Sequence, residues 1–123
     1  MLKFVEMDER VTLAEQMGQD IGPVILINKF TVAEEDADQL LRAWAADAAW
    51  MKQQLGLISA QLHRGVGGSC VFLNYAVWES MGSFGRAFAN PEFKARLEAY
   101  PPSTVASPHL FQKVAVPGIC VDR

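Results

Sequence analysis

The stretch LLRAWAADAAWMKQQLGLISAQLHRGVGGSCVFLNYAVW, residues 40–78, decides the fold, because a helical pattern is followed there by two β-rich runs. The helical pattern begins upstream, where Thr31 and Glu34 have the spacing of a capping box, and it predicts a helix over Ala33–Gln54. Gly56 stands where a left-handed residue often ends a helix. Charged residues of this segment, Asp47 among them, are expected largely off its apolar stripe.

The two β-rich runs, Leu57–Arg64 and Cys70–Trp78, flank the glycine-rich segment Gly65–Gly68. Such runs joined by a glycine-rich turn predict an antiparallel hairpin. Upstream of the helix, Val24–Phe30 is short and rich in β-branched residues, which favours another strand.

Downstream of the hairpin, a second helical region is expected from Ser80 or Ser83 to Tyr100, interrupted at Asn90–Pro91. A last strand is predicted over His109–Val116. The order βαββαβ is typical of an α+β, ferredoxin-like fold, with a four-stranded antiparallel sheet and two helices on one face.

Length and composition predict one domain of 123 residues, half of them apolar. We interpret residues 1–22 as an N-terminal arm, packed on the domain or on a partner subunit, and residues 23–123 as the domain itself. The net charge of −3 argues against nucleic acid as a partner. No apolar stretch approaches the roughly 20 residues that cross a membrane, so we expect no membrane partner and a cytoplasmic location. Cys70 and Cys120 lack metal or redox spacing and are expected to be small buried residues.

Alternation along the strands places Phe72, Asn74 and Trp78 on one face, with Asn28 and Phe30 of the neighbouring strand available to join them. Tyr75 has the opposite parity and is expected to point toward the helices. Neither face is simply polar, which predicts that the second face is also buried, against another subunit or around a pocket. Two such sheets facing one another form a dimeric α/β barrel, and we predict a C2 homodimer.

The polar residues on these strands are the candidates for chemistry. An amide among apolar neighbours needs a partner, which is backbone, water or a ligand, so Asn74 and Asn28 are either structural or ligand-binding. Trp78 is either core or a pocket wall. His63 is a candidate general base, or a packed or exposed residue beside the turn, and Tyr100 is able to reach a pocket mouth. The sequence has no metal-ligand spacing, no phosphate-binding glycine motif and no GxSxG, so we expect neither a metal nor a nucleotide cofactor.

Three segments resemble the antibiotic biosynthesis monooxygenase family: Leu55–His63, Val77–Ser80 (VWES) and Asn90–Phe93 (NPEF). The similarity covers Pro23–Val116. It implies cofactor-independent oxidation of a small aromatic or polyketide-like substrate by O2, through the substrate anion, in a dry pocket.

The resemblance also implies roles for individual residues. Asn74 or Asn28 would bond the substrate oxygen, Trp78 would form a stacking wall, and His63 would accept the proton. Phe30, Phe72 and Tyr100 complete the expected substrate site. In heme-degrading relatives an asparagine, a tryptophan and a histidine surround the heme; here no histidine lies between Trp78 and His109, which disfavours heme.

Two further functions are compatible with the same fold. One is a small-molecule-binding or stress-response barrel without redox chemistry. The other is an isomerase or cyclase in which deprotonation is the whole reaction.

Overall fold

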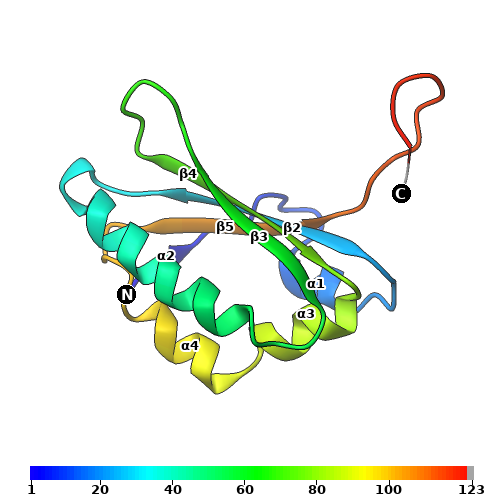
Figure 1. The fold of residues 1–123 in the computed structure, drawn as a ribbon, viewed down its shortest axis with the longest axis horizontal. Coiled ribbons are helices and arrows are strands. Elements are labelled where there is room, and N and C mark those ends of the chain that lie inside the picture. Colours follow the sequence, from blue (N-terminus) through cyan, green and yellow to red (C-terminus); the bar gives the residue numbers. More distant parts are fainter. Residues whose placement is uncertain (122–123) are drawn as a thin grey trace.

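A computed structural model of the chain describes residues 1–121. One sheet is covered on a single face by helices, and the chain leaves the last strand in an extended C-terminal segment (Figure 1). The elements, in chain order, are β1 (Lys3–Phe4), α1 (Leu13–Met17), β2 (Val24–Thr31), a 3-10 turn η1 (Glu34–Asp36), α2 (Ala37–Met51), β3 (Leu57–Arg64), β4 (Val71–Trp78), α3 (Met81–Phe88), α4 (Pro91–Leu97) and β5 (Val105–Phe111).

The sheet has five strands in the order β1-β5-β2-β4-β3. Strands β2, β3, β4 and β5 form the predicted antiparallel ferredoxin-like sheet, but β1 adds a parallel edge beside β5, so the sheet is mixed rather than purely antiparallel. The Lys3 N–H donates to the Thr104 carbonyl at 2.9 Å, and Leu2 is buried in the core. A two-residue strand is too short to produce an alternating pattern, which is why the sequence did not predict it.

The N-terminal segment therefore packs on its own domain in this chain. Its short helix α1 starts at a complete capping box of Thr12 and Glu15 and buries Leu13. The Gln16 side chain then bonds both the N–H and the carbonyl of Leu110 along the free edge of β5.

Helix α2 begins later and ends earlier than predicted. The capping box of Thr31 and Glu34 does not form, because β2 continues through Thr31. Instead the Ala33 N–H donates to the Ser103 hydroxyl at 3.2 Å, and that hydroxyl donates to Asp36 at 2.7 Å. At the other end Gly56 has φ 98°, the left-handed conformation expected of it, in a turn that follows the last helical residue, Met51.

The second helical region is divided into two helices, α3 and α4. With the short α1, residues 1–121 therefore contain four α-helices instead of two. The break falls at Asn90–Pro91 as predicted, because the Asn90 side chain caps α4 by accepting the Glu92 N–H at 2.9 Å. Pro91 lies in the first turn of α4, where its missing N–H has no helical partner to lose.

The last strand was misplaced by the sequence. It covers Val105–Phe111 instead of His109–Val116. Pro108 is tolerated inside it because β1 pairs only with Val105 and Ala106, which leaves that edge of β5 without a strand at Pro108.

The two faces of the sheet are also the reverse of what was expected. Phe72 and Trp78 are each 1 % exposed and belong to the face that carries the helices. Tyr75 has the opposite parity and lies on the open face, with Val77 and Ile25, where these side chains are half-buried. Alternation groups the residues correctly, but both groups are apolar, so it does not indicate which group the helices cover.

Candidate active site

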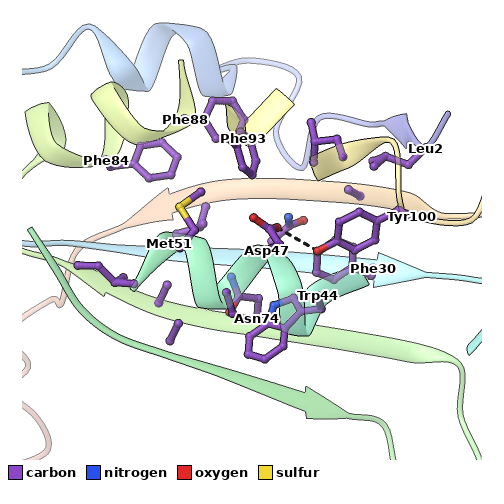
Figure 2. A pocket seen from close by; sticks show the side chains of 18 of the residues that line it. Leu2, Phe30, Trp44, Asp47, Met51, Asn74, Phe84, Phe88, Phe93 and Tyr100 are labelled. Atoms are coloured by element: carbon purple, nitrogen blue, oxygen red, sulfur yellow. Dashed lines mark hydrogen bonds between the residues drawn. The ribbon is translucent and has the colours of Figure 1, made fainter. Parts of the chain in front are cut away.

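A cavity lies between the helix-covered face of the sheet and helices α2, α3 and α4 (Figure 2). Its volume is about 50 Å³. Most of its wall is aromatic or aliphatic, and Phe84, Phe88, Phe93 and Met51 close the side formed by the helices (Figure 2). A largely apolar space of this kind has a low effective dielectric constant, which strengthens any electrostatic interaction inside it.

Four polar atoms in the wall of this cavity are buried and have no hydrogen-bond partner. They are Asn28 Oδ1, Asn74 Oδ1, Trp78 Nε1 and Asp47 Oδ1. Asn28 and Asn74 are directly opposite one another on β2 and β4, so their amides are cross-strand neighbours. Unpartnered polar atoms in an apolar site cost about 1–3 kcal/mol each, which a ligand with matching groups would recover.

Asp47 is the residue that sequence reasoning missed. It is buried on α2, and its Oδ2 accepts a hydrogen bond of 3.0 Å from the Tyr100 hydroxyl (Figure 2). The spacing Leu40–Trp44–Asp47–Met51 already placed this carboxylate on the apolar stripe, but acidic residues on an amphipathic helix are usually solvated, and that expectation prevailed.

Burial raises the pKa of Asp47 from 3.8 to about 6, against the opposing effects of the Tyr100 hydrogen bond and the Arg96 charge. Burial and the neighbouring Asp47 carboxylate raise the pKa of Tyr100, so its phenol stays neutral and remains a donor. The Tyr100 ring stacks on Phe30, with centroids 5.6 Å apart and an interplanar angle of 11°, which fixes its position. The pair therefore presents a rigid carboxylate that is ionised at neutral pH.

The structure brings five of the predicted site residues to this one cavity: Asn28, Phe30, Asn74, Trp78 and Tyr100.

Two predicted site residues, Phe72 and His63, and the second histidine of the chain, His109, do not line the cavity. Phe72 is in the core on the same face but does not line the cavity, and Arg64 lies over its ring at 4.9 Å. His63 is exposed, with Nδ1 3.3 Å from the Leu73 carbonyl, and its pairing with Leu73 places it on the open face. The structure thus does not bring His63 to the cavity. His109 lies outside it, beside Gln16, with 3.1 Å between the two Nε2 atoms.

Residues 1–121 contain no group of three or more His, Cys, Asp or Glu side chains placed to hold a metal ion. No helix among these residues is long and apolar enough to cross a membrane.

The fold and the site are those of an α+β, ferredoxin-like protein with a largely apolar cavity between the sheet and the helices. Residues 23–99 match the family described as antibiotic biosynthesis monooxygenase. Because the match covers more than half of the chain, the protein belongs to the antibiotic biosynthesis monooxygenase family.

Solved structures agree with this assignment. SnoaB, a cofactor-independent oxygenase from Streptomyces nogalater, is 26% identical, with a TM-score of 0.71 over 80% of this chain and 99% of its own. A protein from Shewanella loihica PV-4, described as a candidate monooxygenase, is 27% identical, with a TM-score of 0.67 over 80% of this chain and 100% of its own. A Caulobacter crescentus protein at 19% identity shares the fold, with a TM-score of 0.65 over 76% of this chain and 92% of its own. No curated protein matches the chain significantly.

Proposed function

We propose that the protein is a cofactor-independent monooxygenase that oxidises a small aromatic or polyketide-like substrate with O2 in the cavity between the sheet and α2. The observation that carries the proposal is the set of unpartnered polar atoms, Asn28 Oδ1, Asn74 Oδ1 and Trp78 Nε1, in a largely aromatic and aliphatic cavity. The family and the similarity to SnoaB support oxygen chemistry.

In this proposal the substrate itself supplies the electrons. An anthrone-like substrate loses a proton from an activated carbon, and its anion passes one electron to O2. The resulting radical and superoxide combine to form a C–O bond, and the peroxide, once protonated, loses water to leave a carbonyl. One oxygen atom of O2 enters the product and the other leaves as water.

The protein's share is to bind the anion and to exclude water. The unpartnered Trp78 indole N–H and the amide N–H groups of Asn28 and Asn74 would be the donors to a substrate oxygen. The unpartnered amide oxygens of Asn28 and Asn74, which face one another across β2 and β4, would accept a hydrogen bond from a substrate O–H. Preorganised donors in a water-excluded site stabilise developing negative charge far better than they do in water. Stacking on the aromatic wall would set the orientation of the ring system.

The cavity must open to admit such a substrate. Its volume of about 50 Å³ is a third of the roughly 150 Å³ that holds benzene in an engineered protein cavity. Three of the partly exposed side chains that line it, Trp44, Met51 and Phe88, lie on α2 and α3. We therefore expect these two helices to separate when the substrate enters, while the sheet stays in place.

The open face of the sheet supports a homodimer as part of the proposal. Ile25, Ile27, Leu73, Tyr75 and Val77 gather there, and in the isolated chain these side chains are only half-buried. A contiguous apolar face of this kind is unusual in a monomer. A C2 pair of these faces would cover both and form the dimeric α/β barrel.

Oxygen uptake by metal-stripped protein tests the proposal, with a panel of anthrones, hydroquinones and flavonoids. We expect uptake with at least one panel member, and a loss of about 100-fold in Asn74→Ala, as when a donor to an oxyanion is removed. Gln53→Ala, an exposed amide at the end of α2, is the matched control and should keep full activity. Tight binding of an aromatic without uptake would refute oxidation and favour a small-molecule-binding barrel.

A further inference from the structure

The carboxylate of Asp47 has a placement that the binding of an anion does not explain. Among the residues that line the cavity it is the only acid, and a negative charge there would repel the substrate anion. Its two oxygens differ: Oδ2 is held by the Tyr100 hydroxyl at 3.0 Å, whereas Oδ1 is buried without a partner. Oδ2 is therefore held in place by Tyr100, whereas Oδ1 is able to accept a proton from a bound molecule.

The surroundings hold this carboxylate ready to take up a proton. Arg96 on α4 is the cation whose charge favours the ionised form, and Tyr100 donates a hydrogen bond to that form. These two are the titratable or charged groups that act on Asp47. Burial among Trp44, Met51 and Phe93 opposes ionisation, so the carboxylate is a stronger base than a solvated one and still carries its charge at neutral pH.

We propose that Asp47 is the catalytic base of this protein, and that Tyr100 is its positioning residue. Oδ1 accepts a proton from the hydroxyl or the activated methylene of the bound substrate. The substrate O–H or C–H bond breaks, its electron pair stays on the substrate as the anion, and a new O–H bond forms on Asp47. Transfer of the proton neutralises Asp47, which removes the repulsion between its carboxylate and the new anion. The proton later returns to the peroxide oxygen that O2 supplies.

This assignment rests on the proposed function for the fate of the anion, but the proton transfer is separable from oxidation. It replaces the role that the sequence had given to His63, which lies exposed on the other face of the sheet. If Asp47 is the base, exchange of substrate protons with solvent must take place without O2.

The test is therefore anaerobic exchange of the methylene protons of anthrone with D2O, followed by NMR and paired with aerobic oxygen uptake. We expect the wild type to accelerate exchange, and Asp47→Asn to lower both exchange and uptake by about 10²–10⁴-fold, the usual contribution of a general base. Asp38→Asn, an exposed acid at the start of α2, is the matched control and should behave as wild type. Binding of anthraquinone, which has no proton to give, should change by less than about threefold in Asp47→Asn, which shows that the cavity is intact.

The variant Tyr100→Phe tests whether Tyr100 positions the Asp47 carboxylate or only packs in the core. Removing the hydrogen bond that favours the carboxylate should move the acidic limb of the exchange rate from about pH 6 to higher pH, with the plateau largely retained.

The outcomes distinguish the two proposals. Exchange that depends on Asp47 with no oxygen uptake would support the base and overturn the oxidation. If exchange or uptake in Asp47→Asn stayed within about threefold of wild type, and the acidic limb of Tyr100→Phe did not move, the assignment of Asp47 as the catalytic base would be overturned. Absence of both reactions in the wild-type protein, with every panel member, would overturn both proposals.

Discussion

The two faces of the sheet are built from the same strands, yet they differ in what they do with polar groups. The helix-covered face buries Trp78 and leaves amide and carboxylate oxygens without partners around a cavity. On the open face the apolar side chains are half-buried, and His63 bonds the Leu73 carbonyl in contact with solvent. The candidate site therefore lies on the covered face, where four unpartnered polar atoms gather around one cavity and a single ligand could satisfy several of them.

The largest effect expected from this difference is on stability. Phe72→Ala, on the covered face, should lower the free energy of unfolding by about 3–5 kcal/mol through lost burial and the void it leaves. Val71→Ala, its neighbour on the open face, is 41 % exposed and should cost less than about 1 kcal/mol. Urea unfolding of the two variants at one protein concentration measures both, and equal losses would break the distinction between the faces.

The next effect is the pH dependence that Asp47 imposes. Since its pKa is raised from 3.8 to about 6 in the folded chain, its contribution to stability is complete below pH 3.8 and is lost as pH rises through 6. Between pH 4.5 and 7.5 the wild type should lose about 2 kcal/mol relative to Asp47→Asn, which has no proton to release. Unfolding curves at the two pH values give this difference, and parallel behaviour of both proteins would show that the carboxyl is not buried as described.

A comparable effect is expected on assembly, and it comes from the open face. Tyr75→Asp should weaken the proposed dimer by about 100-fold, or about 2.7 kcal/mol, because a carboxylate would be buried without a partner at the interface. Sedimentation velocity over a concentration series measures the dissociation constant. Ala45→Asp, on an exposed position of α2, is the control that should leave assembly unchanged. If Tyr75→Asp remained as dimeric as the control, the second subunit would not lie on this face.

The smallest effect is on the stability of α3, one of the helices that cover the sheet. Ser80 caps α3 by accepting the Ser83 N–H at 3.1 Å, so Ser80→Ala should cost about 1 kcal/mol. Ser80→Asp keeps an acceptor at the same place and should restore most of that loss. Thermal unfolding followed by circular dichroism compares the two, and equal melting temperatures would argue that the cap contributes little to holding α3 over the cavity.

Sequence reasoning predicted most of the fold, for physical reasons that the errors make clear. Helix α2 and the hairpin of β3 and β4 have long periodic patterns, whereas β1 has two residues and no pattern at all. The last strand was displaced because Pro108 resembles a boundary, although one edge of β5 is free of a strand at that point. Alternation grouped Asn28, Asn74 and Trp78 correctly, since parity is a local property.

The rest of the site depends on long-range packing that one sequence does not display. Asp47 meets Tyr100 across 53 positions of the chain, and only the approach of α2 to the segment after α4 brings their side chains into contact. Which face the helices cover is likewise a property of the whole fold, so Tyr75 was placed toward them and His63 was assigned to the cavity. An acid at a stripe position of an amphipathic helix was the one local signal of Asp47 that the sequence contained.

In the proposed function the substrate binds on the helix-covered face, beside Asn74 and Asp47. A crystal structure of the protein with anthraquinone, a ligand that it cannot oxidise, tests this most directly. We expect the ring system between α2 and β4, with a carbonyl oxygen within hydrogen-bond distance of Trp78 Nε1 and with α2 displaced outward. Anthraquinone bound on the open face, beside Tyr75, with the cavity unchanged, would contradict the account.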